Sequence, residues 1–144
     1  MQISNILQSK GTLVVSISGA LSILDASREL TRCGIGAIVV SDSGEGIDGI
    51  LSERDIARAL AAHGADALDL RVADVMTTDV TTCALTDTTD DLAEVMTAQR
   101  IRHLPVLDGG RIVGVVSIGD IVKQRLDELQ VETRTLHEYL YSGR

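Results

Sequence analysis

The chain of 144 residues carries one sequence pattern twice. Residues 49–56 (GILSERDI) return as residues 114–121 (GVVSIGDI), and residues 34–40 (GIGAIVV) correspond to residues 100–106 (RIRHLPV). The register between the two matches changes by one residue, which fits one extra residue in the loop at 41–48. Further matches join 14–17 to 80–83 and 3–7 to 72–76. Because a period near 65 residues is too long for an open solenoid repeat, we predict two similar units that pack on each other as one pseudo-symmetric domain.

Composition limits what this domain can bind. A hydrophobic content of 44% is enough for one sound core but hardly for two independent ones. The chain has no Phe or Trp and only two Tyr, so it lacks the aromatic platforms on which single-stranded nucleic acids stack. A formal charge of −8 repels a phosphate backbone, which argues against a nucleic-acid partner. The sequence shows no signal-peptide pattern and no apolar run of membrane-spanning length, so we expect a cytoplasmic protein without a membrane partner.

No set of residues matches a catalytic or metal-binding pattern. Cys33 and Cys83 are far apart and form no CxxC pair, so we expect buried free thiols. The three histidines form no cluster at metal-ligand spacing. The sequence also has no recognised nucleophile motif and no GxxxxGK[ST] loop. We therefore predict no catalytic residue, no metal site and no enzyme activity.

Each unit is predicted to fold as strand, helix, strand, strand, helix. Periodic apolar positions predict a helix over 21–33, and Thr88 followed by acidic residues predicts the start of its counterpart. Glycine-containing turns are expected at 42–46 and 108–110. The predicted strands are 13–17, 34–40 and 47–51 in the first unit, and 80–83, 104–107 and 111–116 in the second.

Taken together, the two units resemble a tandem of cystathionine β-synthase (CBS) motifs, the module also called a Bateman domain. The segments that carry the resemblance are 35–40 and 49–55 in the first unit, and 74–77, 80–82, 102–106 and 114–120 in the second. The resemblance implies an α/β fold of two pseudo-symmetric β-α-β-β-α motifs packed as one domain, with a C-terminal helix. We expect motif 1 at 1–68, motif 2 at 69–127 and a helical extension at 128–144. One departure is Pro105, which stands where the first unit has Val39.

A Ser-x-x-Asp pattern precedes the last helix of each unit, at Ser52/Asp55 and Ser117/Asp120. Helix capping explains it, because the hydroxyl accepts a bond from a first-turn amide and the carboxylate complements the helix dipole. The same geometry also suits a ligand, since a helix N-terminus favours phosphate and a carboxylate can accept both hydrogens of a ribose diol. Both interpretations stay open at this stage.

The resemblance implies two ligand clefts between the motifs, in which the Asp binds ribose and the Ser lies along the sugar and phosphate. Adenine would pack against backbone and small residues of the other repeat. Arg102 and His103 interrupt an apolar segment and are either edge residues or phosphate partners. Arg54 is interpreted as a solvated surface charge. The first cleft is expected to contain Ser16, Gly36, Ala37, Ile38, Arg102, Ser117 and Asp120, and the second Ser52, Asp55, Thr82, His103 and Leu104.

The C-terminal segment carries a narrow apolar stripe at heptad-like spacing. Such a stripe needs another helix to pack against, either within the domain or in a second copy. Because CBS pairs commonly assemble as two-fold dimers, the resemblance favours a homodimer. The stripe consists of Val122, Leu126, Leu129, Thr133, Leu136 and Leu140.

We therefore expect a regulatory sensor that binds an adenosine-containing ligand between its motifs and acts on a protein partner. AMP, ATP, NAD and S-adenosylmethionine are the candidate ligands, and no obligatory cofactor is expected. The alternative is a constitutive dimeric interaction scaffold that binds no nucleotide.

Overall fold

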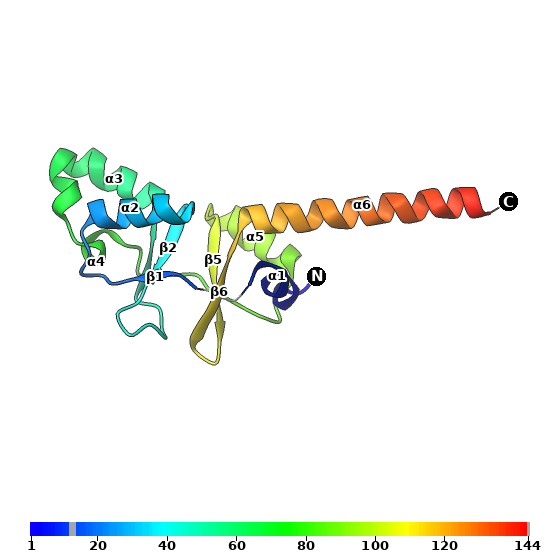
Figure 1. Cartoon of the computed structure of the whole chain (residues 1–144), viewed down its shortest axis with the longest axis horizontal. Helices are drawn as coiled ribbons and strands as arrows, with labels where there is room; N and C mark the ends of the chain where they lie inside the picture. Colours follow the sequence, from blue (N-terminus) through cyan, green and yellow to red (C-terminus); the bar gives the residue numbers. More distant parts are fainter. Residues whose placement is uncertain (12–13, 144) are drawn as a thin grey trace.

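The computed structural model describes residues 1–11 and 14–143. Two three-stranded sheets lie side by side, with orders β1-β2-β3 and β4-β5-β6 (Figure 1). In each sheet the first two strands are parallel and the last two antiparallel. The two-unit α/β fold with a C-terminal helix is thus confirmed. The strands are β1 (Ser16–Ile17), β2 (Ala37–Val40), β3 (Gly49–Ser52), β4 (Cys83–Ala84), β5 (His103–Asp108) and β6 (Arg111–Ser117).

Helices α2 and α5 connect the parallel strands, and α3 and α6 follow the last strand of each unit. Thr88 caps α5 as predicted, and its side chain accepts a hydrogen bond from Asp91 N. The helix predicted over 21–33 begins at Ile23 because Ser22 is its N-cap residue. The helices are α1 (Ile3–Lys10), α2 (Ile23–Cys33), α3 (Glu53–His63), α4 (Val72–Val75), α5 (Thr89–Gln99) and α6 (Ile118–Ser142), with a 3-10 helix η1 (Gly64–Asp69).

Several strands differ from their predicted bounds. The strand expected over 34–40 begins only at Ala37, because Gly34 ends α2 in the left-handed conformation. The strand expected over 80–83 begins at Cys83, and of the one expected over 13–17 only Ser16 and Ile17 are paired, Leu13 lying outside the described residues. Pro105 is tolerated inside β5 because β4 pairs only with Val106 and Leu107.

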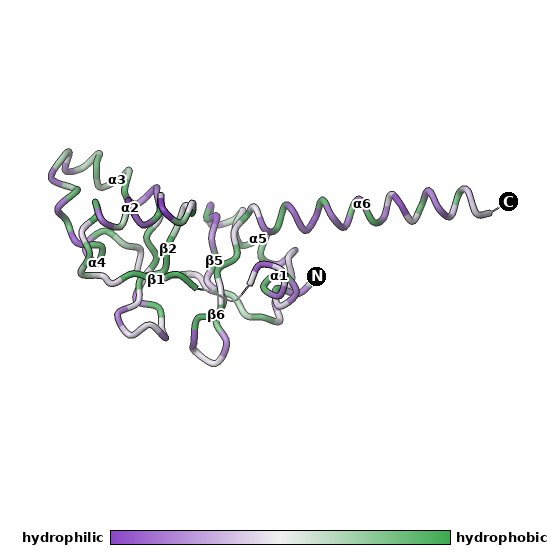
Figure 2. Tube along the Cα trace, in the orientation of Figure 1, coloured by the Kyte–Doolittle hydropathy of each residue, from purple (hydrophilic) through white to green (hydrophobic). Residues whose placement is uncertain are grey.

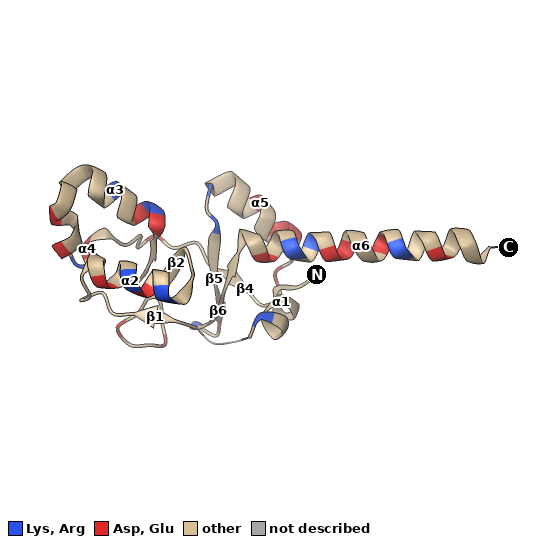
Figure 3. Ribbon diagram, turned by 45° about the horizontal axis from the view of Figure 1, so that its top comes forward, with Lys and Arg blue, Asp and Glu red and all other residues tan. Residues whose placement is uncertain are grey.

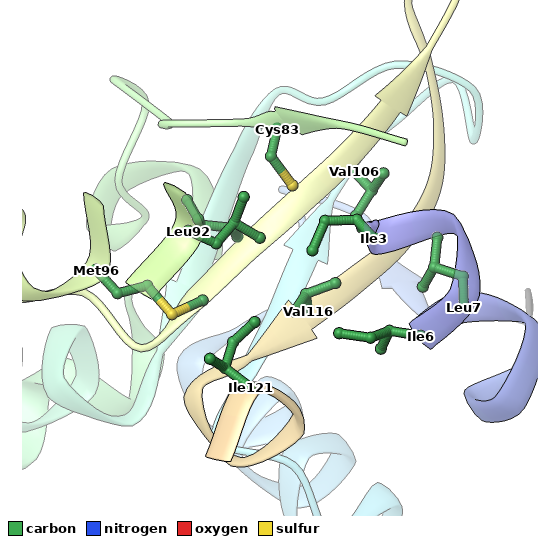
Figure 4. Packing of buried hydrophobic residues seen from close by; sticks show 10 residues of the cluster. Ile3, Ile6, Leu7, Cys83, Leu92, Met96, Val106, Val116 and Ile121 are labelled. Atoms are coloured by element: carbon green, nitrogen blue, oxygen red, sulfur yellow. The ribbon is translucent and has the colours of Figure 1, made fainter. Parts of the chain in front are cut away.

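Two short helices are exchanged between the units. Helix α1 places Ile3, Ile6 and Leu7 in the core of the second unit, against Val106 and Val116 (Figure 4). Reciprocally, α4 places Val72 in the core of the first unit. Matching backbone bonds hold them, from Ile3 N to Asp87 O at 2.9 Å and from Val72 N to Leu21 O at 2.8 Å. Residues 1–68, expected as motif 1, therefore include a helix that completes the core of the other motif.

The exchanged helices explain the glycine that begins both copies of the 49–56 pattern. A Cβ on Gly49 would lie 2.6 Å from Met76 Sδ and 2.7 Å from Thr77 O. At the equivalent Gly114, a Cβ would lie 2.6 Å from Leu7 Cδ2. Glycine lets the segment that follows α4, and α1 itself, pack directly on the strand; a side chain would meet the Thr77 carbonyl at position 49 and would displace the Leu7 side chain at position 114.

Helix α6 runs straight out of the domain over most of its length (Figure 1). The stripe predicted from the sequence lies on it unpaired, with exposed fractions of 51% for Val122, 55% for Leu126, 45% for Leu129, 59% for Leu136 and 64% for Leu140. Apolar and polar segments alternate along this helix (Figure 2), and charges of both signs punctuate it (Figure 3). No helix among the described residues is long and apolar enough to span a membrane.

The two thiols have different surroundings. Both are free, as expected, and Cys83 is buried in the core of the second unit. Burial, with the charge of Asp87, raises the pKa of the Cys83 thiol to about 12. Cys33 is only partly buried, so the prediction of a buried thiol is wrong there, because the last turn of α2 leaves that side chain at the surface beside Glu29.

Candidate functional site

Two clefts lie between the units, on either side of a wall formed by Gly36, Ala37 and His103. We call the one lined by four arginines the arginine cleft and the one lined by Lys10 the Lys10 cleft. Two further hollows beside α2 are more open to solvent and share only Gly36 with the predicted site. The arginine cleft has a volume of about 530 Å³ and includes Ser52, Arg54, Asp55, Arg58, Thr77, Asp79, Arg100 and Arg102. The Lys10 cleft has a volume of about 300 Å³ and includes Leu7, Lys10, Val14, Val15, Ile35, Ile38, Val39, Val115 and Ser117.

Both Ser-x-x-Asp patterns form complete capping boxes, so the capping interpretation is confirmed. In the first box Ser52 N donates to Asp55 Oδ2 at 2.9 Å, and Asp55 N donates to Ser52 Oγ at 3.2 Å. The cap occupies one oxygen of Asp55. Its other oxygen, Oδ1, accepts a hydrogen bond from the Thr77 hydroxyl at 3.2 Å. Asp55 is only 8% exposed and lines the arginine cleft, so a ligand there could reach its carboxylate by displacing Thr77.

At Asp120 the additional partner is Lys10, which binds the capping oxygen Oδ2 and not the opposite oxygen, the one that Thr77 binds in Asp55. Its ammonium group donates to Asp120 Oδ2 at 2.7 Å and to Val115 O at 2.8 Å. Partial burial alone would raise the pKa of Asp120, but the hydrogen bonds from Lys10 and Ser117 and the charge of Lys10 outweigh burial and lower it. Beyond their capping bonds, the two pseudo-equivalent carboxylates therefore accept hydrogen bonds from different donors, a neutral hydroxyl for Asp55 and a cation for Asp120.

His103 separates the two clefts. Its Cε1 atom lies 3.5 Å from where a Cβ on Gly36 would stand, so the imidazole packs directly on the backbone of the first unit. Burial, followed by the charges of Arg102 and Lys10, lowers the pKa of His103, although Glu53 and Asp120 oppose that shift. The ring is therefore neutral near pH 7. It can donate one hydrogen bond and accept another at the boundary between the clefts.

Arg100 stands out in its backbone conformation. It ends α5 with φ 55° and ψ 42°, and it is the one non-glycine residue with positive φ among the residues described. The equivalent residue at the end of α2 is Gly34, with φ 66° and ψ 35°. A left-handed conformation costs a residue with a side chain roughly 1–2 kcal/mol, and glycine avoids most of this cost.

The structure brings most of the predicted site residues to the clefts. Gly36, Ala37, Ile38 and Ser117 line the Lys10 cleft, while Ser52, Asp55 and His103 line the arginine cleft. Asp120 adjoins the Lys10 cleft through its bonds with Lys10 and Ser117.

Other predicted site residues lie elsewhere. Arg102 lines the cleft of Asp55, whereas the sequence assigned it to the cleft of Asp120. Leu104 is buried in the second core, and Ser16 and Thr82 are exposed outside both linings. Thr82 stands before β4 because that strand begins one residue later.

Three cationic cleft residues were missed from the sequence, and a fourth was interpreted differently. Lys10 and Arg58 belong to no motif or repeat match, Arg100 lies in the repeat match of 34–40 with 100–106 but was not assigned to the site, and Arg54 was interpreted as a solvated charge. Aligning the repeats could have singled out Arg100, because a helix-ending glycine stands at the matching position. No group of three potential metal ligands occurs in the part of the chain that the structure describes.

Comparison with known proteins identifies the family. The family model for the CBS domain matches residues 13–62 and 72–127. The chain is 33% identical to the mitochondrial CBS domain-containing protein CBSX3 of Arabidopsis thaliana, over 98% of this chain and 72% of that protein. The solved structure of the CBS-domain containing protein ATU1752 from Agrobacterium tumefaciens is 42% identical, with a TM-score of 0.84 over 86% of this chain and 92% of that one.

A further solved structure includes ligands. The CBS domain pair of protein MJ0100, in complex with 5′-methylthioadenosine and S-adenosyl-L-methionine, superposes with a TM-score of 0.78. It is 26% identical, over 89% of this chain and 98% of that one. From the repeated fold and these matches, the chain belongs to the CBS domain family and carries two CBS motifs.

Proposed function

We propose that this protein is a regulatory module that binds an adenosine-containing ligand between its two CBS motifs. The observation that carries the proposal is the arginine cleft, where the Ser52/Asp55 capping box of one motif faces Arg100 and Arg102 of the other. Its volume of about 530 Å³ lies in the range of small-molecule sites. The complex of the MJ0100 pair with two adenosine compounds supports this ligand class.

In this proposal Asp55 accepts hydrogen bonds from the ribose hydroxyls, and cations across the cleft contact phosphate. A ligand in this position touches both motifs at once. It would therefore favour the arrangement of the motifs in which both sets of contacts form, and a partner protein would sense that arrangement. No chemical step is involved, so the protein acts as a sensor and not as an enzyme.

Binding is tested by thermal unfolding with AMP, ATP, NAD and S-adenosylmethionine. A ligand at 100 times its Kd adds roughly 2.7 kcal/mol to the stability of the folded state. Calorimetric titration of Asp55→Ala and Asp120→Ala then tests the site, because loss of charge-assisted bonds to ribose should weaken binding about ten- to a hundred-fold. Unchanged affinity in both well-folded variants would leave the two capping boxes as structural elements only.

The exposed stripe on α6 supports a homodimer, with a second copy of α6 as the occupant. Heptad spacing is the pattern of two helices that pack on each other. A parallel pair is favoured, because Glu132 and His137 are five residues apart on opposite sides of the stripe and would then face each other across the two copies, where the imidazole can donate a hydrogen bond to the carboxylate. In an antiparallel pair with full overlap, Glu132 of each copy would approach the other.

The same stripe favours the second candidate function, a constitutive dimeric scaffold. That function requires assembly through α6 but no ligand. A dimer whose unfolding temperature responds to none of the four ligands would support the scaffold and contradict the sensor.

A further inference from the structure

We propose that the arginine cleft selects an adenosine ligand with two or three phosphates over one with a single phosphate or none. This inference rests on the proposed function and names the ligand class of one of its two sites. It is carried by the charges of the cleft, by their distribution over both motifs and by the backbone conformation of Arg100.

The arginine cleft has more positively than negatively charged residues, whereas the whole chain is acidic. Four arginines line it together with Asp55 and Asp79, although the whole chain has a formal charge of −8. Arg58 approaches Asp55 Oδ1 only at 3.9 Å. None of the ion pairs among the described residues involves the other three arginines. These guanidinium groups are therefore available to an anion.

The arginines reach the cleft from both motifs. Arg54 and Arg58 belong to α3, whereas Arg100 and Arg102 lie in the connection between α5 and β5. That connection carries the blue segments between these two elements in Figure 3. Arg54 Nη1 donates to Arg100 O at 3.3 Å, so the two groups meet across the cleft. One phosphate is satisfied by one or two bidentate arginines, and four arginines on two walls suit a chain of phosphates.

Arg100 adopts a left-handed backbone conformation that a glycine would adopt at lower cost. Its N–H bonds to Met96 O and its carbonyl accepts from Arg54, and a glycine would provide both groups without strain. The first motif has glycine at this position. What arginine adds is an exposed cation at the cleft, and strained residues of this kind gather at ligand sites.

The Lys10 cleft lacks the arginines of the other cleft. The one lysine or arginine among its described lining residues is Lys10, whose ammonium group is bound to Asp120. A ligand with several phosphates would find no free cation there. The two clefts of this protein are thus unequal in charge although they are related by the repeat.

Calorimetric titration with adenosine, AMP, ADP and ATP, without added divalent cation, tests the inference. The unmodified protein should bind ADP and ATP at least ten-fold more tightly than AMP. Arg100→Gly should lose about ten- to a hundred-fold in ATP affinity, as expected for one charge-assisted contact, with little change for adenosine. Its unfolding temperature should be unchanged or higher, because the substitution relieves the left-handed backbone.

Three further variants keep the test independent of folding. Arg102→Ala should weaken ATP in the same way. The control Arg134→Ala, at an exposed position of α6 outside both clefts, should leave ATP affinity unchanged. Equal affinities for AMP and ATP, or an ATP affinity that responds to Lys10→Met, in the other cleft, and to neither Arg100→Gly nor Arg102→Ala, would overturn the inference while ligand binding stands. If none of the four compounds binds the unmodified protein but NAD or S-adenosylmethionine does, the inference fails and the proposed function stands. If none of these six compounds binds, the proposed function itself fails.

Discussion

Lys10 Nζ lies 2.7 Å from Asp120 Oδ2 and joins the end of α1 to the first turn of α6 across 110 residues of sequence. We predict that Lys10→Met lowers the free energy of unfolding by up to about 1 kcal/mol at pH 7, since the pair is partly exposed. Because the folded-state pKa of Asp120 is lowered, its contribution to stability is present above the unfolded pKa, near about 4.

That contribution is lost as the pH falls through the lowered folded-state pKa of Asp120. The difference between the variant and the unmodified protein should therefore shrink in strong acid. Urea unfolding at neutral pH and below about pH 3 measures it. A difference that persists undiminished in acid would show that Lys10 stabilises the fold by packing and not through its charge.

The two strand glycines should respond unequally to alanine. Gly49→Ala drives a methyl group against the Thr77 carbonyl and should cost about 1–3 kcal/mol. Gly114→Ala meets the end of the flexible Leu7 side chain and should cost less. Gly46→Ala is the control, because nothing lies within 4 Å of its added Cβ. Denaturant unfolding of the three variants gives the order, and equal costs at 49 and 114 would contradict it.

The two thiols should react at different stages of unfolding. In the native protein a thiol reagent such as iodoacetamide should modify Cys33 at neutral pH. Cys83 should resist it, because the thiol is buried and its pKa is raised to about 12. Mass spectrometry of native and urea-unfolded samples locates the label. Rapid native labelling of Cys83 would show that the core of the second unit opens locally.

Replacing Leu129 and Leu136 by Asp should convert a dimer to monomers, because charges would then face the apolar stripe of the second α6. The matched control is Val131→Asp with Thr135→Asp, which adds the same charge to exposed positions off the stripe. Sedimentation of both double variants decides the contact. A dimer that survives in the stripe variant would place the interface elsewhere on the molecule.

Features that depend on neighbours in sequence could be predicted. The helix start at Thr88 and the Ser-x-x-Asp capping boxes are local hydrogen-bond patterns, and the structure contains them. Strand ends were less predictable because they depend on partners. Thr82 was predicted to line a cleft but does not, because β4 pairs with its neighbour only from Cys83 onward.

Features that depend on the meeting of distant segments could not be predicted. Periodicity gives α1 an apolar face but does not reveal which core receives it, and the position of Lys10 follows from that docking. The side chain of Arg102 lies on the arginine-cleft side of Gly36, Ala37 and His103. The pattern of a strand in the sequence does not determine on which of the two sides a side chain lies. Arg100 is intermediate, since a repeat alignment exposes its unusual position but not its cleft.

The exchange of α1 and α4 means that each hydrophobic core contains a helix from the other unit's part of the chain. The two motifs therefore cannot loosen independently, because moving one apart from the other pulls a helix out of its neighbour. The proposed ligand would contact both motifs at once. Occupancy of a single cleft would in this way change the packing of both units. The change would reach the first turn of α6, because Ile121 lies in the same core as α1.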